Sequence, residues 1–148
     1  AEFDAVVNLY TSFGYFTPAE NARVLRRMAR ALKPGGRLIV DHRDPIYDAA
    51  VPGRLWYRAG RRGFILEHRR FDRRTGIVDT TQLVLTDGRR GAVQRRFRIQ
   101  EFSLARWRSM LRRVGLRLLG AYAGYDGRRY RPGATGRLIV VAERPMRP

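Results

Sequence analysis

The side chains best suited to acid–base chemistry follow two apolar runs of the sequence. Tyr15 lies a few residues after the run at positions 3–10, and His42 follows the run at positions 38–40. A phenol and an imidazole can each accept a proton from a substrate group, and imidazole titrates near neutral pH. The chain has no cysteine, which excludes thiolate catalysis, disulfides and cysteine-based metal sites. Tyr15 and His42 are therefore the candidate general bases.

A strand–helix–strand pattern positions these two residues. The run at 3–10 is nearly continuous, which is typical of a strand buried on both faces of a parallel sheet. Residues 17–20 (Thr-Pro-Ala-Glu) form a capping box, and the helix that follows ends at residues 33–36 (Lys-Pro-Gly-Gly). The run at 38–40 predicts a second buried strand. The unit is thus βαβ, with parallel strands and a right-handed crossover.

The rest of the chain has a different pattern. Irregular sequence at 44–62 precedes three alternating segments, and the turn signals between them, at 72–76 and 87–88, predict an antiparallel meander. The alternating segments are 64–71, 77–86 and 93–102. Ser103 then caps a helix, and two last strands follow. The sequence predicts one α/β domain with three parts: a βαβ core (1–43), a loop and antiparallel segment (44–102), and a terminal helix with an antiparallel strand pair (103–148).

The strongly basic composition does not by itself identify a partner. Of 148 residues, 31 are Lys or Arg and 13 are Asp or Glu, which gives a net charge of +18. An apolar fraction of 44% predicts a folded chain rather than a disordered polycation. All but one of the basic residues are arginine, the exception being Lys33, which favours GC-rich codon bias over a phosphate-binding surface. A basic nucleic-acid-binding or RNA-modifying module is the alternative function.

The sequence predicts a cytoplasmic protein without a membrane partner. Its longest apolar runs fall far short of the roughly 20 residues that cross a bilayer. The first residues carry two acids and no basic start, which argues against a signal peptide.

Two motifs resemble class I S-adenosylmethionine (SAM)-dependent methyltransferases. Residues 3–8 (Phe-Asp-Ala-Val-Val-Asn) and 32–40 (Leu-Lys-Pro-Gly-Gly-Arg-Leu-Ile-Val) resemble the fourth and fifth strands of that family. Residues 8–16 resemble a bacterial branch of small-molecule methyltransferases, including amino-sugar N-methyltransferases, with an antiparallel lid after the fifth strand. The resemblance covers essentially the whole chain. It implies a partial Rossmann-like sheet, strands four to seven, with an antiparallel β-meander insertion.

The resemblance implies SAM-dependent N- or O-methylation of a small-molecule acceptor. Methyl transfer is an in-line displacement, so close contact between nucleophile and methyl group in a desolvated pocket provides much of the rate. The residues expected to contact the methionine part of SAM are Asn8, Leu9, Tyr10, Thr11 and Ser12. The residues expected to contact the acceptor are Phe13, Gly14, Tyr15, Arg43, Trp56, Tyr57 and Tyr125. No metal is expected.

Several of these residues also have purely structural interpretations. Tyr15 would pack on the capped helix, and His42 would be a solvated residue at a strand end. Trp56 and Tyr57 would anchor their loop. These alternatives stay open at the level of sequence.

The match departs from the family where SAM is held. The family has a glycine-rich turn after its first strand and an acidic residue after its second, and both precede the segment that residues 3–8 resemble. No other segment replaces them, because residues 35–36 end a helix and residues 124–136 have no helix behind them. The sequence thus predicts a truncated domain, the C-terminal half, with an incomplete SAM site. The strand from Phe3 to Tyr10 would then be an exposed edge, open to self-association or a partner chain.

Overall fold

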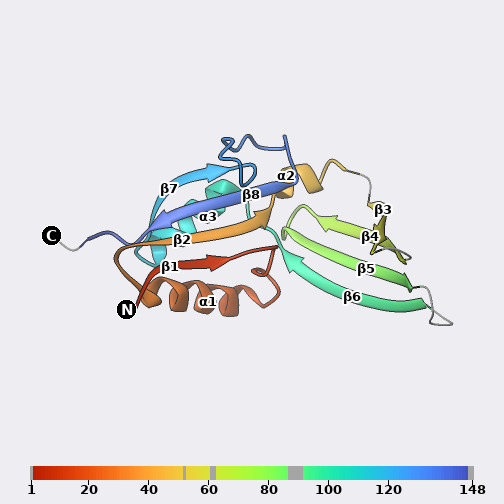
Figure 1. Ribbon diagram of the computed structural model, residues 1–148, viewed down its shortest axis with the longest axis horizontal. Helices are drawn as coiled ribbons and strands as arrows, with labels where there is room; N and C mark the ends of the chain where they lie inside the picture. Colours follow the sequence, from red (N-terminus) through yellow and green to blue (C-terminus); the bar gives the residue numbers. More distant parts are fainter. Residues whose placement is uncertain (1, 52, 61–62, 87–91, 147–148) are drawn as a thin grey trace.

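The computed structural model contains two four-stranded sheets joined end to end (Figure 1). It describes residues 2–51, 53–60, 63–86 and 92–146, and the turn predicted at 87–88 lies outside them. The elements are β1 (Phe3–Asn8), α1 (Pro18–Ala31), β2 (Leu32–Arg43), α2 (Pro45–Asp48), β3 (Arg54–Ala59), β4 (Gly63–Asp72), β5 (Ile77–Thr86), β6 (Ala92–Gln100), α3 (Leu104–Arg113), β7 (Arg117–Tyr122) and β8 (Arg137–Glu143). None of the helices in the described ranges is long and apolar enough to cross a membrane.

The first sheet has the strand order β1-β2-β8-β7. Strands β1 and β2 are parallel, whereas β8 is antiparallel to both β2 and β7, so the predicted βαβ unit and terminal strand pair are confirmed. In Figure 1 the arrowheads of β1 and β2 point toward the second sheet, and both chain ends lie at the opposite end. The carboxyl ends of the parallel strands therefore meet the second sheet.

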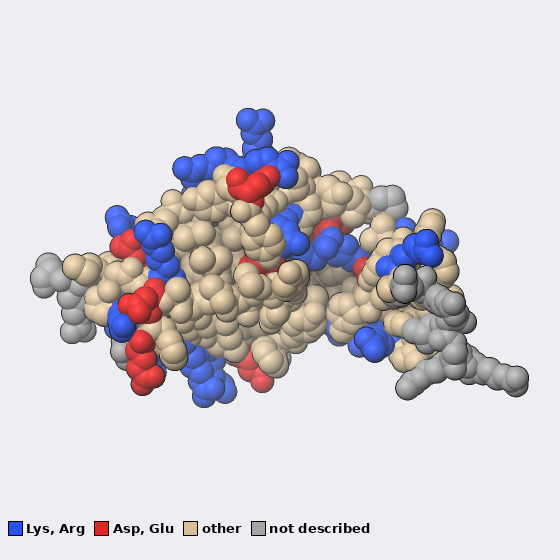
Figure 2. Space-filling view, viewed as in Figure 1, with Lys and Arg blue, Asp and Glu red and all other residues tan. Residues whose placement is uncertain are grey.

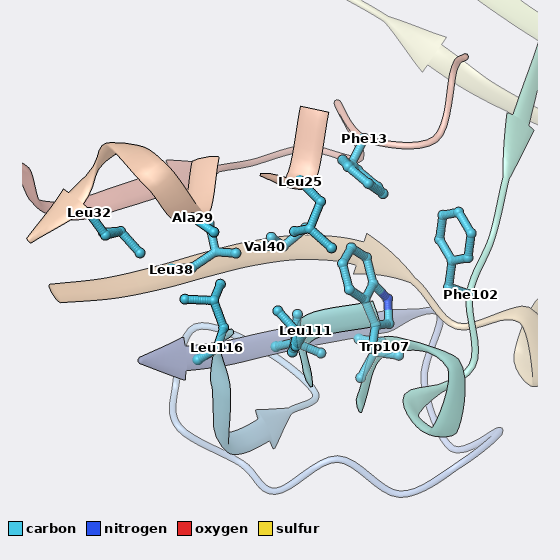
Figure 3. Packing of buried hydrophobic residues seen from close by; sticks show 13 residues of the cluster. Phe13, Leu25, Ala29, Leu32, Leu38, Val40, Phe102, Trp107, Leu111 and Leu116 are labelled. Carbon is cyan, nitrogen blue, oxygen red and sulfur yellow. The ribbon is translucent and has the colours of Figure 1, made fainter. Parts of the chain in front are cut away.

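Helices α1 and α3 pack on one face of the first sheet. The capping box of α1 is confirmed, because the Glu20 N–H donates to Thr17 Oγ1 and the Thr17 N–H donates to Glu20 Oε2. Side chains from both helices meet the apolar residues of β2 and β8 in one core (Figure 3). The fully enclosed members of this core include Leu25, Leu38, Val40, Trp107, Leu111, Leu138 and Val140. Burial of these apolar side chains holds α1 and α3 against the sheet.

The prediction of a strand at 3–10 buried on both faces is wrong. Strand β1 ends at Asn8, and the side chains of Phe3 and Val7 are 53% and 57% exposed. The reason is position, since β1 is an edge strand that pairs only with β2 within the described ranges. Val6 packs against the core, and its neighbours point away from it.

The second sheet is an antiparallel meander with the order β3-β4-β5-β6. The three predicted strands are confirmed as β4, β5 and β6. The interpretation of 44–62 as irregular is wrong for 54–59, which form β3, with Trp56 opposite Leu66 of β4. Pairing with β4 overrides the weak local signal of a short arginine-containing segment.

Candidate functional site

The chain makes an unusual turn directly after β1. Tyr10 and Thr11 have φ angles of 55° and 56°, a left-handed conformation that residues with a Cβ rarely adopt. The Tyr10 N–H donates to Oδ2 of Asp41 (3.0 Å), and the Thr11 N–H donates to the Asp41 carbonyl (3.1 Å). The Ser12 hydroxyl donates to the Leu9 carbonyl at 2.5 Å. The predicted cofactor segment is thus a strained turn docked on the end of β2.

Asp41 is the centre of a buried polar cluster beside this turn. Its side chain is 2% exposed, and Oδ2 also accepts hydrogen bonds from Tyr125 Oη and Arg137 Nη1, both at 2.5 Å. The Arg137 guanidinium lies 4.9 Å from the ring centre of Tyr125. The hydrogen bond to Asp41 raises the pKa of Tyr125, so its phenol stays protonated and donates.

Sequence reasoning only partly found this cluster. It gave no role to Asp41 or to Arg137. An acid directly after an apolar strand was the available signal for Asp41. Tyr125 was predicted to contact the acceptor, but in this structure its hydroxyl is bonded to Asp41.

Phe13 and His42 lie inside the protein rather than on a pocket wall. Phe13 is 2% exposed and His42 is 1% exposed, and their rings pack with Trp107. The two ring nitrogens of His42 face the carbonyls of Phe13 (3.1 Å) and Arg43 (3.2 Å). Burial lowers the pKa of His42, so the ring is neutral and can donate to only one of the two. The prediction of a solvated or catalytic His42, and of Phe13 against the acceptor, does not fit this placement.

Gly14 and Tyr15 connect the turn to the second sheet. The Gln100 N–H at the end of β6 donates to the Gly14 carbonyl at 2.8 Å. The φ angle of Gly14 is +104°, and a Cβ at this position would lie 2.4 Å from the Gln100 carbonyl oxygen. Tyr15 remains 48% exposed, with its ring centre 6.2 Å from that of Phe97 on β6. Of the two predicted bases, Tyr15 is therefore the one whose side chain is accessible to a ligand.

Four charged side chains join the two sheets next to this site. Arg43 forms a bidentate pair with Asp48 at 2.5 Å, and Arg69 of β4 bonds to the same carboxylate. Glu101 lies 3.5 Å from Arg43 and from Arg69. The Arg43 guanidinium, predicted to bind substrate, is occupied by these acids. Sequence reasoning missed Asp48, Arg69 and Glu101, because no local pattern brings them together.

Trp56 and Tyr57 lie away from Tyr15. They belong to β3, which is separated from β6 by two strands. Trp56 pairs across strands with Leu66 and is 73% exposed on the face opposite to that of Phe97. The Tyr57 hydroxyl lies on the other face, bonded to Glu67 at 3.3 Å. The prediction that Trp56 closes over the acceptor is not supported by this placement.

Several cavities flank the charged junction. One of about 520 Å³ is lined by Arg43, Tyr47, Arg69 and Arg137, among others. A larger one of about 880 Å³ lies between α2, the β4–β5 turn and the start of α3. Across the described ranges, no group of three or more His, Asp or Glu side chains could hold a metal ion.

Comparison with solved structures identifies the fold. The CcbJ methyltransferase from Streptomyces caelestis is 19% identical, with a TM-score of 0.81, over 97% of this chain and 61% of that chain. A SAM-dependent methyltransferase from Clostridium acetobutylicum is 13% identical, with a TM-score of 0.80, over 97% of this chain and 59% of that chain. A sugar N-methyltransferase from Streptoalloteichus sp. is 23% identical, with a TM-score of 0.68, over 97% and 57%.

The predicted fold class is therefore confirmed. The chain has the α/β fold of part of these SAM-dependent methyltransferases, and it spans about three fifths of their length, 61% and 59% for the first two. No protein-family model matches the sequence, and no curated protein matches it.

Proposed function

We propose that this chain is part of a SAM-dependent methyltransferase acting on a small-molecule acceptor. The observation that carries the proposal is the strained turn at Tyr10 and Thr11. It lies at the carboxyl end of a parallel strand, where open α/β sheets bind ligands, in a fold shared with known methyltransferases. Strain of this kind is concentrated at functional sites.

The turn offers groups that fit the methionine part of SAM. Oδ1 of Asn8 is buried without a hydrogen-bond partner in the described part of the chain. A buried acceptor without a donor is costly, and an ammonium group would satisfy it. We assign cofactor contact to Asn8, Leu9, Tyr10, Thr11 and Ser12. When bound, SAM supplies the electrophilic methyl group on its sulfonium.

We assign the acceptor to the exposed side of Tyr15, next to its contact with Phe97 of β6. The ring of Tyr15 is half exposed beside Phe97, so it can orient an acceptor and exclude water from one side. Its phenol is our candidate to accept a proton from an ammonium or hydroxyl acceptor. Both N- and O-methylation fit this arrangement. We do not propose His42 as a base, because both of its ring nitrogens face backbone carbonyls.

In the part of the chain that the structure describes, no glycine-rich turn between a strand and a helix is present to hold the rest of SAM. We therefore propose that residues 1–148 bind the cofactor weakly by themselves. We also propose that the exposed edge of β1 pairs with another strand, either from a second copy or from a partner chain.

Methyl transfer from radiolabelled SAM to small amines and alcohols tests the function. Amino sugars come first, because similar structures include a sugar N-methyltransferase and an amino pentose methyltransferase. We expect wild-type protein to transfer methyl groups to at least one of these acceptors. Tyr15→Phe should lose most of this methyl-transfer activity. The proposed site would be wrong if Tyr15→Ala and wild-type protein transferred methyl groups equally well.

Binding to generic RNA tests the alternative. Two of the three arginines of β6, Arg96 and Arg98, pair with Asp79 at 3.2 and 3.1 Å, which reduces the positive charge that this strand offers to phosphate. Basic side chains on the face shown in Figure 2 are interspersed with acidic ones rather than gathered into one patch. We expect weak binding, and tight binding that falls steeply with added salt would favour the nucleic-acid module instead.

A further inference from the structure

The left-handed turn after β1 is not explained by packing. The side chain of Tyr10 is 79% exposed, so its conformation does not place an apolar group in the core. Two consecutive residues with a Cβ share the left-handed conformation, which persists only where the surroundings hold it. Groups beside the turn must therefore hold its backbone in this conformation. Packing of the core does not require the conformation.

The restraint comes from one residue of β2. Asp41 accepts a hydrogen bond from each backbone N–H group of the turn. The Tyr10 N–H donates to the Asp41 carboxylate, and the Thr11 N–H donates to the Asp41 backbone carbonyl. The carbonyl is part of the strand backbone and would be present with any side chain. The carboxylate contact depends on the aspartate itself.

Residues from the C-terminal part of the chain donate hydrogen bonds to this carboxylate. Tyr125, from the loop between β7 and β8, and Arg137, the first residue of β8, both donate to the same oxygen that receives the Tyr10 N–H. Arg137 Nη1 also donates to the Tyr125 hydroxyl at 3.0 Å. A buried charge with three donors on one oxygen has little freedom to move.

We propose that Asp41 is a positioning residue whose carboxylate fixes the turn of Tyr10 and Thr11 in the shape that receives the cofactor. That the ligand is the cofactor rests on the proposed function. That Asp41 restrains the turn does not, because it follows from the hydrogen bond to the Tyr10 N–H. Tyr125 and Arg137 act through Asp41: they orient its carboxylate toward the turn. The loop between β7 and β8 thereby influences the cofactor side of the site without contacting the cofactor.

Amide hydrogen exchange followed by NMR tests the restraint without any activity. In Asp41→Asn we expect the Tyr10 amide to exchange about 10-fold faster or more, because its charged acceptor is lost, whereas the Thr11 amide keeps its backbone acceptor and changes less. Amides of the β2–β8 pairs, such as Ile39 and Val141, keep their wild-type rates. Asp126→Asn is the matched control, since it neutralises an exposed acid in the same loop that pairs with Arg128.

If Asp41→Asn does not fold, Tyr125→Phe tests the same restraint, because it removes the hydroxyl that donates to the Asp41 carboxylate. This exposed ring can lose its hydroxyl without disturbing the core, and we expect faster exchange confined to the turn, by several-fold. Unchanged exchange at Tyr10, whose N–H bonds to the carboxylate, would overturn the proposal. Equal acceleration throughout β2 would also overturn it, because Asp41 would then only support the sheet.

Titration with S-adenosylhomocysteine (SAH), read from the same spectra, connects the restraint to the ligand. We expect both variants to require several-fold more SAH than the Asp126→Asn control to shift the amides of residues 8–12. An affinity for SAH equal to that of the control would overturn the link to the cofactor. If the wild-type amides do not respond to SAH at all, the proposed function fails, and the exchange rates still decide whether Asp41 restrains the turn.

Discussion

At the scale of single residues, Asp48 and Glu101 share a buried site but hold their protons differently. Burial opposes ionisation of Asp48, but hydrogen bonds from Arg43, Glu101 and Arg69 outweigh it and lower its pKa to about 2. Burial and the neighbouring Asp48 raise the pKa of Glu101 to about 9. At neutral pH the junction therefore contains one carboxylate, one carboxylic acid and two arginines.

The raised pKa of Glu101 makes stability fall as pH rises. Between about pH 4.5 and about pH 9 the folded chain keeps a proton that the unfolded chain releases, so unfolding becomes more favourable with rising pH. In Glu101→Gln this loss disappears, because glutamine resembles the protonated acid. Urea unfolding at about pH 5 and about pH 8 should show a smaller decrease in the variant than in wild type. Glu143→Gln, which removes a half-buried carboxylate that pairs with the exposed Arg117, is the control and should follow wild type.

Asp48 makes the opposite contribution. Its lowered pKa stabilises the fold above about pH 4, and this stability is lost as pH falls toward about 2. Asp48→Asn removes the carboxylate that the two arginines share but leaves Glu101 3.5 Å from both, so the free energy of unfolding should fall by less than the about 3–5 kcal/mol of a fully broken buried pair. Thermal and urea unfolding at neutral pH measure the loss. A change below about 1 kcal/mol would contradict the junction as described.

At the scale of elements, Gly14 sets the approach of the turn to the second sheet. A Cβ there would meet the Gln100 carbonyl at 2.4 Å, and the φ angle of +104° is unfavourable for any other residue. Gly14→Ala should lower the free energy of unfolding by more than about 2 kcal/mol. Gly115→Ala is the matched control, because that glycine also has a positive φ but has open space at its Cβ position.

The control separates backbone strain from the clash. Strain alone in Gly115→Ala costs about 1–2 kcal/mol. Equal losses in the two variants, measured by urea unfolding, would show that the contact between the turn and β6 is not tight. A larger loss in Gly14→Ala supports the close contact on which the placement of Tyr15 depends.

At the scale of the whole molecule, β1 leaves an apolar edge uncovered in the described part of the chain. Val7 is 57% exposed, and an edge strand presents unpaired backbone groups to other chains. We expect Val7→Lys to reduce concentration-dependent association without lowering the melting temperature. Sedimentation velocity over a range of concentrations measures this.

Val93→Lys is the matched control, since Val93 is 44% exposed on β6, an edge strand of the second sheet. It adds the same charge at a different edge. If both substitutions reduce association equally, general charge repulsion rather than pairing along β1 is responsible.

The sequence predicted those secondary-structure elements that are encoded by a local pattern of residues. The capping box at Thr17 and Glu20 and the alternation of β4 and β5 are local patterns, and each formed the predicted element. Strand β3 was missed because its pairing with β4, rather than its own sequence, makes it a strand.

The candidate site was predictable in place but not in detail. The resemblance placed the cofactor segment at residues 8–12, and the structure has its strained turn there, at the carboxyl end of β1. It could not show that His42 would turn inward to two carbonyls, or that Tyr125 would reach Asp41 across 84 positions of sequence. Such contacts depend on tertiary packing, which a single sequence does not display.

The most direct test of the central claim is an NMR titration of the wild-type chain with SAH. The account predicts that the backbone amides that shift are concentrated at residues 8–12 and near Asp41, and that they shift in a saturable way even if the affinity is weak. Shifts confined to the arginines of the second sheet, or no saturable shift at residues 8–12 with millimolar SAH, would contradict a cofactor-facing turn.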